Sequence, residues 1–313
     1  MKKKNKKNDG IKTMGLMERM WKSRYYYLLL LPAVAYVLIF DYAPMYGLQI
    51  AFKNYKVSLG MAGSKWIGFR NFTDFFNSYS FPQLMKNTFV LSLYQIVIGF
   101  PIPIIVALVL NELKGAGFKK ATQTILYAPH FISTVVLVGI IRTMFSPSQG
   151  AINTLLEAIG MERIYFMGDP KYFRHLYVWS GVWQGMGWGA IIYLAALAGV
   201  DPALHESADI DGATRMQKIL HINIPTILPT IIIMLILRMG QIASIGYEKV
   251  YAMQNNLNVS TAEVISTYVY KRGLINNNYS FSTAVGLFNN VVNITMLLIA
   301  NKFSKMVSET SLF

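Results

Sequence analysis

The sequence of 313 residues lacks cysteine and is poor in charge. Without cysteine it has no disulfide, no thiolate metal site and no cysteine nucleophile. Charged residues make up 14% of the chain and apolar residues 54%, whereas soluble domains carry about 25% charged residues. This balance favours folding in a lipid bilayer rather than in water.

The chain also lacks the residue patterns of an ATPase or a hydrolase. None of its 23 glycines is followed by lysine, and a phosphate-binding loop of the G-x-x-x-x-G-K-[ST] type needs that step. The 4 histidines have no H-E-x-x-H spacing, and no serine stands in a G-x-S-x-G turn. We therefore expect no catalytic residue, no metal site and no cofactor in this chain.

Six stretches are long and apolar enough to cross a membrane, which takes roughly 20 residues per helix. Inside hydrocarbon every backbone amide must be paired internally, so these stretches are expected to be helices. The sequence thus predicts an all-α, polytopic membrane protein with six transmembrane helices. The predicted spans are residues 25–49, 87–110, 123–142, 176–198, 222–244 and 284–300.

The net charge of +14 is concentrated at one end, since 9 of the 29 Lys and Arg residues lie in the first 24 positions. A basic run directly before a hydrophobic span is typical of a cytoplasmic flank held by anionic lipid. A nucleic-acid site would instead spread its charge over a folded face, so we expect lipid and no nucleic acid as the partner of this tail.

Six spans place both termini on the same side, and the basic tail puts them in the cytoplasm. Lys and Arg are about twice as dense in the segments that this topology places inside as in the outer loops. We expect a multi-pass protein of a prokaryotic plasma membrane. Its predicted parts are a cytoplasmic tail (1–24), a six-helix permease domain (25–304) and a short cytoplasmic tail (305–313).

The loop between the fourth and fifth spans, residues 201–220, is the most informative segment. Asp201 is a candidate N-cap with Pro202 at the first helical position. Gly212 is a natural helix breaker, and a second short helix is expected from Arg215. The sequence predicts a helix–turn–helix at the cytoplasmic face.

The order of residues in this loop resembles the motif of ABC importer permeases, which runs Glu-Ala-Ala to Gly to Ile-x-Leu-Pro. The matching residues here are Glu206-Ser207-Ala208, then Gly212, Ile222 and Ile224-Pro225, with the spacing of the motif throughout. Ser207 and Ile224 depart mildly from the alanine and leucine of the family. The sugar-importer version of the motif is matched further by Asp211-Gly212-Ala213 and Pro229.

Other segments look like the polysaccharide branch of the same family, whose membrane subunits are similar to those of maltose transporters. They are Trp66–Phe72, Tyr127–Ser133, Gly168–Pro170 and Leu194–Leu197. The resemblance covers most of the chain beyond the basic tail. It implies the architecture of an ABC type I importer permease.

This resemblance implies the partners and the cargo. They are a second permease in a heterodimer, two ATP-binding subunits that hold ATP and Mg²⁺, an extracellular solute-binding protein and a carbohydrate, with an oligosaccharide expected. The loop would be the coupling helix that contacts an ATP-binding subunit through Glu206, Ser207, Ala208, Asp211, Gly212 and Ala213. Three alternatives stay open: a permease for another solute such as a glycerol phosphate, a stand-alone secondary carrier, and a membrane-embedded enzyme.

Polar and aromatic side chains inside the spans are the candidates for the substrate path, because such groups are costly at membrane depth. The alternatives are interfacial anchoring for tryptophan and helix–helix hydrogen bonding for the amides. An arginine in a span could also neutralise an acidic cargo. The candidates are Trp183, Trp188, Arg238, Gln241, Asn289 and Asn293.

Overall fold

The computed structural model describes residues 16–307. Most of the predicted N-terminal tail, and residues 308–313 of the C-terminal one, lie outside the described residues. The chain forms two compact units, Met1–Gln49 and Ile50–Phe313. Each is described by itself.

The described residues of the first unit, 16–49, are almost entirely helical. It contains α1 (Leu16–Lys22), α2 (Arg24–Val37), the π-helical η1 (Leu38–Tyr42) and the start of the 3₁₀ helix η2 (Ala43–Phe52). Together, residues 24–52 are long and apolar enough to cross a membrane. The guanidinium of Arg24 lies over the rings of Trp21 and Tyr25, at 5.2 and 4.6 Å. Such a basic and aromatic cluster is typical of the membrane–water interface.

Three further candidate spans are continuous helices of the second unit, residues 81–112, 215–239 and 279–306. Two of them contain a π-helical turn close to prolines, which interrupt the regular backbone hydrogen bonds of a helix. The span 81–112 comprises α5 (Phe81–Tyr94), the π-helical η4 (Gln95–Gly99) and α6 (Pro101–Glu112). The span 215–239 comprises α12 (Arg215–Lys218), the π-helical η6 (Ile219–Asn223) and α13 (Ile224–Met239), and the span 279–306 lies in α17 (Tyr279–Val307).

The third predicted span is a bent pair of helices instead of one straight helix. The first arm comprises α7 (Ala116–Tyr127) and η5 (Ala128–Phe131), and the second arm, α8 (Thr134–Met144), turns away by 98°. The bend follows from local structure, because Ile132 is extended and the Ser133 side chain caps α8 by accepting a hydrogen bond from Val136 N.

The fourth span, α10 (Pro170–Leu197), is also followed by a sharp bend of 78° into α11 (Pro202–Ile210). Residues 16–307 therefore contain four straight candidate spans, and six when each bent pair is counted as one. This agrees with the six predicted spans in number.

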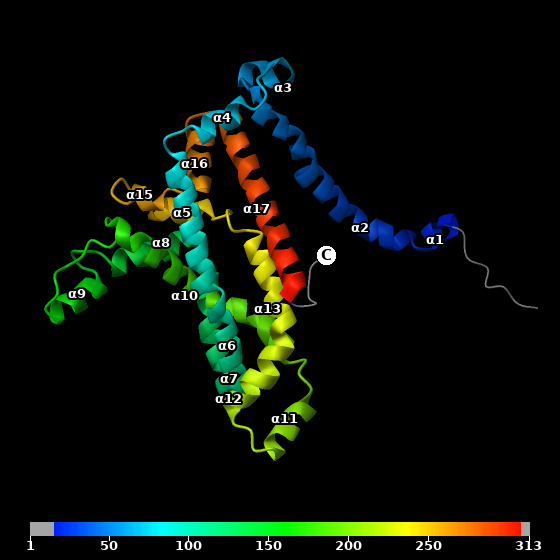
Figure 1. Cartoon of the computed structure of the whole chain (residues 1–313), viewed down its shortest axis with the longest axis vertical. Coiled ribbons are helices and arrows are strands. Elements are labelled where there is room, and N and C mark those ends of the chain that lie inside the picture. Colours follow the sequence, from blue (N-terminus) through cyan, green and yellow to red (C-terminus); the bar gives the residue numbers. More distant parts are fainter. Residues whose placement is uncertain (1–15, 308–313) are drawn as a thin grey trace, which may run out of the picture. The chain divides into compact units, whose positions relative to one another are not determined.

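Short elements fill the remaining loops of the second unit. Strand β1 (Lys53–Asn54) pairs antiparallel with β2 (Lys65–Trp66), with Lys53 opposite Trp66. The short helices are η3 (Val57–Leu59), α3 (Gly60–Gly63), α4 (Arg70–Phe76), α9 (Ala151–Ala158), α14 (Tyr247–Met253), α15 (Val259–Ala262), α16 (Ile265–Tyr270) and η7 (Lys271–Ile275). In Figure 1, α3, α4 and α16 lie at one end of this unit and α11 and α12 at the other. We name these the α4 end and the α11 end.

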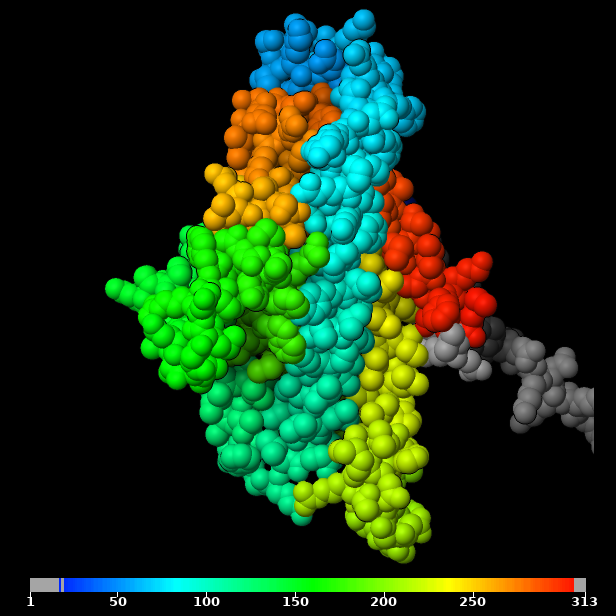
Figure 2. All heavy atoms as spheres, turned by 60° about the vertical axis from the view of Figure 1, so that its left-hand side comes forward, coloured from blue at the N-terminus to red at the C-terminus, as the bar shows by residue number. Residues whose placement is uncertain are grey.

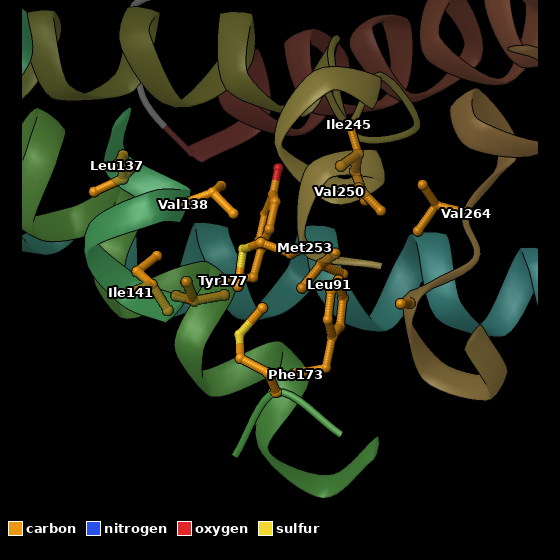
Figure 3. Packing of buried hydrophobic residues seen from close by; sticks show 13 residues of the cluster. Leu91, Leu137, Val138, Ile141, Phe173, Tyr177, Ile245, Val250, Met253 and Val264 are labelled. Atoms are coloured by element: carbon orange, nitrogen blue, oxygen red, sulfur yellow. The ribbon is translucent and has the colours of Figure 1, made fainter. Parts of the chain in front are cut away.

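Helix α10 is the centre of the second unit, since it contributes residues to two of the three apolar clusters. Toward its start, Phe173 and Tyr177 pack with residues of α5, α8 and α14 (Figure 3). Toward its end, Ala190 and Tyr193 pack with α6 and α13. In Figure 2 the green α8–α9 region stands out from the cyan and teal column of α5 and α6.

One glycine fixes how closely α10 approaches its neighbour. A Cβ placed on Gly187 would lie 2.1 Å from the carbonyl oxygen of Leu126 in α7. Within a bilayer, helices associate through such close packing because lipid tails leave little hydrophobic driving force between them. Gly187 is therefore required for the α7–α10 contact.

Candidate coupling loop and substrate path

The loop after α10 forms the predicted helix–turn–helix. The Asp201 carboxylate accepts a hydrogen bond from Ala203 N at 2.9 Å, and Pro202 opens α11. Gly212 ends it with φ of +72°, a conformation that favours glycine. The amide of Ala213 then donates to the Ala208 carbonyl at 2.8 Å. Each turn of the loop is thus closed by its own residues.

The second helix of the loop, α12, is held in the same local way. Thr214 and Gln217 form a capping box, in which the Thr214 amide donates to Gln217 Oε1 at 2.7 Å. Lys218 donates to the carboxylate of Asp209 and so ties α12 to α11. This hydrogen bond from Lys218 holds the pKa of Asp209 below its usual value.

The α11 helix has no buried residue. Of the six predicted contact residues, Glu206, Ser207, Asp211 and Gly212 are exposed, and Ala208 and Ala213 are half-buried. Large apolar side chains are also exposed along the loop: Leu204, Ile210 (88% exposed) and Met216. A solvated connection would not need such side chains, whereas a docking surface does.

A buried amide joins the end of the loop to α6, a contact that sequence reasoning missed. Asn223 is fully buried in η6, and its Nδ2 donates to Glu112 Oε1 at 3.4 Å. Asn223 follows Ile222 in the loop motif, but only the fold brings it beside the end of α6. The loop is therefore connected to two spans, α13 by continuity and α6 by this contact.

A cavity of about 310 Å³ lies between η4, α6, α10 and α13. Its α10 wall carries Gly181, Gly185 and Gly189, which recur at intervals of four residues and so share one face of the helix. Its polar side chains are those of Gln95, Tyr193 and Arg238, and the remaining lining residues are Gly99, Phe100, Pro103, Val178, Val182, Met186 and Met234. Arg238 is the one predicted path residue that lines this cavity.

The two predicted tryptophans lie elsewhere on α10. Trp183 lines a separate, apolar cavity of about 580 Å³ against α8. Trp188 stacks on His130, with ring centroids 4.5 Å apart and ring planes within 1° of parallel. Neither tryptophan is brought next to Arg238.

The predicted amides do not line the Arg238 cavity either. Asn293 is buried and bonds the segment after α13, donating to Ser244 Oγ at 2.6 Å and accepting from Ala243 N at 2.8 Å. Asn289 Oδ1 is buried with no hydrogen-bond partner among the described residues. Gln241 is exposed just beyond α13. Asn293 thus bonds α17 to the turn that follows α13.

Lys249 is a basic residue at the edge of this cavity that sequence reasoning missed. From α14 its Nζ donates to the Tyr177 carbonyl at 2.9 Å and lies 4.7 Å from the centre of the Tyr177 ring. A Cβ on Gly181 would be 3.2 Å from the same Nζ. Burial lowers the pKa of Lys249 to about 8. Because Lys249 lies in a loop beyond the fifth predicted span, its position in the sequence did not indicate that its side chain reaches α10.

Nearer the start of α10, a third cavity of about 400 Å³ is lined by Tyr94, Pro170, Lys171, Arg174, His175 and Thr261. The Tyr94 hydroxyl and His175 Nδ1 are hydrogen-bonded at 2.7 Å. Arg174 Nη2 donates to Asn87 Oδ1 at 3.0 Å, while its buried Nε has no partner among the described residues. We name it the basic cavity, after the Lys171 and Arg174 side chains that line it.

Residues 88–307 match the family of binding-protein-dependent transport system inner membrane components. The chain belongs to this family. It is a multi-pass membrane subunit of an importer, not an enzyme, and the matched region includes the whole loop and the Arg238 cavity.

Two curated relatives come from Bacillus subtilis (strain 168). Protein LplB is 43% identical over 304 residues, covering 97% of this chain and 95% of the relative. The polygalacturonan/rhamnogalacturonan transport system permease protein YteP is 41% identical over 298 residues, covering 95% and 93%. A solved bacterial alginate ABC transporter, in complex with an alginate pentasaccharide-bound periplasmic protein, has a chain that superposes with a TM-score of 0.87 at 42% identity. The match covers 95% of this chain and 99% of that one.

Proposed function

We propose that this chain is one half of a heterodimeric permease that imports an oligosaccharide, delivered by an extracellular binding protein and driven by two separate ATP-binding subunits. The α11 end faces the cytoplasm and docks on an ATP-binding subunit. The binding protein docks at the α4 end, and the Arg238 cavity forms part of the substrate path. ATP and Mg²⁺ are bound by the ATP-binding subunits.

The observation that carries this proposal is the geometry of the α11–α12 loop. Its helices are fixed by caps, a glycine turn and the Lys218–Asp209 ion pair, all within the loop. Leu204, Ile210 and Met216 remain exposed on it. A rigid element with an apolar surface, continuous with α13 and bonded to α6 through Asn223, can convert closure of an ATPase dimer into movement of the spans.

The basic residues support the cytoplasmic position of the α11 end. The described part of the N-terminal flank carries Lys22 and Arg24 next to a candidate span. Under the positive-inside rule this flank is cytoplasmic. Six spans then place the loop between the fourth and fifth spans on the same side.

The cavity on α10 supports a carbohydrate cargo. Its volume of about 310 Å³ is at the lower end of the range of ligand pockets, and the partner permease would add a second wall. On its α10 wall a Cβ placed on Gly185 would meet nothing within 4 Å, so a ring can approach the backbone there. The names of relatives agree, since they include permeases for polygalacturonan/rhamnogalacturonan and for arabinooligosaccharides.

The proposal is tested by reconstitution of this chain with its partner permease, ATP-binding subunits and binding protein in proteoliposomes. We expect uptake of labelled oligosaccharide that requires ATP inside and the binding protein outside. Uptake that persists without the ATP-binding subunits would show a secondary carrier and overturn the proposal. ATP-driven uptake of a glycerol phosphate but of no saccharide would contradict the proposed carbohydrate cargo. It would agree with the proposed ATP-driven mechanism.

A further inference from the structure

One face of α10 joins the Arg238 cavity to the basic cavity near its start. Lys171, Arg174, Val178, Gly181, Gly185 and Gly189 line these two cavities, and their spacing of three and four residues places them on a single stripe of the helix. The stripe is about 27 Å long at a rise of 1.5 Å per residue. It runs from the cavity at Lys171 and Arg174 to the Arg238 cavity.

Four cations lie along this stripe: Lys171 and Arg174 at its start, Lys249 beside Gly181, and Arg238 deeper in. No aspartate or glutamate lines either cavity. Arg238 also lies close enough to the Tyr177 hydroxyl to act on it electrostatically. Arg238 and Lys249 thus both lie near Tyr177, and of these three residues Arg238 lines the inner cavity.

The ion pairs among the described residues lie outside the stripe. Residues 16–307 contain four ion pairs, Arg70–Asp74, Arg163–Glu157, Lys218–Asp209 and Lys271–Glu263. None of them involves a cation of the stripe. Glu248 precedes Lys249 in the chain but is exposed and forms no ion pair with it.

A cation at membrane depth is expensive unless an opposite charge or an acceptor compensates it. Lys249 has one backbone carbonyl and one ring face as partners, and Arg238 has no hydrogen bond or ion pair among the described residues. Arg238 lines an open cavity, and the Lys249 ammonium lies beside Gly181 of the cavity wall. Their remaining donors are therefore available to an anionic ligand, and an arginine can bind a carboxylate through two parallel hydrogen bonds.

We infer that Arg238 and Lys249 are specificity-determining residues that select an anionic oligosaccharide, such as a chain of uronic acids, over a neutral one of the same size. This inference rests on the proposed function, because it assigns the charge of the cargo to that same path. Arg238 binds a carboxylate inside the cavity. Lys249 binds a second carboxylate at the Gly181 edge, and the basic cavity at Lys171 and Arg174 attracts the polyanion to the start of the stripe.

The test compares two saccharides in the reconstituted importer, a uronic-acid tetrasaccharide and its carboxyl-reduced, neutral counterpart. The variants are Arg238→Gln, Arg238→Lys and Lys249→Met, each with the wild-type partners. Arg163→Gln removes one positive charge from an exposed ion pair outside the stripe and is the matched control. Assembly with the partners and the thermal midpoint of each complex are measured first, so that a folding defect is recognised.

We expect Arg238→Gln and Lys249→Met each to lower kcat/KM for the uronate about tenfold or more, because a hydrogen bond to a charged group is lost. Uptake of the neutral saccharide stays within about twofold of wild type. Arg238→Lys retains part of the uronate uptake, since the charge remains while the bidentate geometry is lost. Arg163→Gln leaves both rates unchanged.

A phospholipid headgroup offers an anion of similar chemistry, so the assay is repeated in vesicles with and without anionic lipid. If the cations hold lipid instead, the variants alter the dependence of uptake on anionic lipid and not the ratio of uronate to neutral uptake. An unchanged ratio, an equal loss of both saccharides, or a wild-type importer that carries the neutral saccharide alone would overturn the inference. A wild-type importer that carries neither of these saccharides but imports another oligosaccharide overturns the inference alone, and one that imports no oligosaccharide overturns the proposed cargo.

Discussion

The α11–α12 loop and the α10 cavity differ in how their polar groups are satisfied. In the loop, the cap residues and the Asp209–Lys218 pair find partners within a few residues in sequence. In the cavity, Lys249 and Arg238 have no carboxylate partner, and the groups around them come from distant parts of the chain. A loop that is complete in itself is suited to transmit movement, whereas a cavity with unsatisfied cations is suited to receive a ligand.

The largest effect is expected from a substitution that breaks the loop. Gly212→Pro is incompatible with φ of +72°, because proline fixes φ near −65°. It also removes the amide that donates to the Asp209 carbonyl at 3.1 Å. We expect membrane insertion to be retained and ATP-driven uptake to be abolished, as measured by immunoblot of membranes and by transport.

Gly212→Asn is the matched control, since asparagine tolerates a positive φ better than other residues with a side chain. It should retain most of the uptake. Normal uptake by Gly212→Pro would refute the role of the loop in coupling.

The second-largest effect is expected at α10, the helix that lines the Arg238 cavity. Gly187→Ala places a methyl group against the Leu126 carbonyl, and overpacking of this kind costs about 1–3 kcal/mol. We expect a lower thermal midpoint of the purified complex and loss of uptake of every saccharide. Gly185→Ala, where a Cβ meets nothing within 4 Å, should keep the midpoint of wild type. Equal midpoints for the two variants would contradict the close α7–α10 contact.

The pH dependence of selectivity should be smaller and specific to Lys249. Because its pKa is about 8, the ammonium is charged at pH 7 and mostly neutral at pH 9. Uptake of the uronate relative to the neutral saccharide should therefore fall several-fold over this interval, and Lys249→Met should remove this dependence. The other charged or titratable side chains that contact α14 are Arg142 on α8, Tyr177 on α10 and Tyr270 on α16. If the ratio of uronate to neutral uptake falls equally in the Lys249→Met variant, another titratable group causes the pH dependence.

The same group links stability to pH. An unfolded lysine keeps its proton up to about pH 10.4, so the folded protein binds fewer protons than the unfolded protein between about pH 8 and that value. The contribution of Lys249 to the free energy of unfolding thus rises with pH through this window. This rise should be absent in the Lys249→Met variant, as checked by measuring the thermal midpoints of wild type and variant across this pH window.

The smallest effect is expected at the exposed ion pair of the loop. Asp209→Asn keeps the shape of the side chain and loses its charge, and exposed pairs contribute little. We expect uptake to change by less than about twofold. A loss as large as that of Gly212→Pro would show that the ion pair, and not the glycine turn, sets the geometry of the loop.

The features that were predictable from the sequence belong to the α11–α12 loop, where each contact is made by neighbouring residues. The cap at Asp201, the turn at Gly212 and the second helix at Arg215 depend on neighbouring residues, and the structure confirms them. The bend after Phe131 was missed, because a hydropathy window does not register the extended backbone at Ile132.

The path residues were harder to predict, because they depend on contacts between distant segments. Arg238 was found since a charge inside an apolar span is conspicuous. Lys249 was missed because nothing in its own loop indicates that it reaches Gly181. Trp183 and Trp188 have the expected chemistry, but they lie on α10 away from the Arg238 cavity.

The most direct test of the account uses the absence of cysteine in the 313 residues, which makes any introduced thiol unique in this chain. In the assembled importer, Ser207→Cys on α11 and Ser58→Cys at the α4 end, both exposed positions, are labelled with a photoactivatable thiol-reactive crosslinker. We expect Ser207→Cys to crosslink to an ATP-binding subunit, with a yield that changes on addition of ATP, and Ser58→Cys to give no such product. Crosslinking of the ATP-binding subunit from Ser58→Cys, and not from Ser207→Cys, would contradict the assignment of the α11–α12 loop as the coupling element.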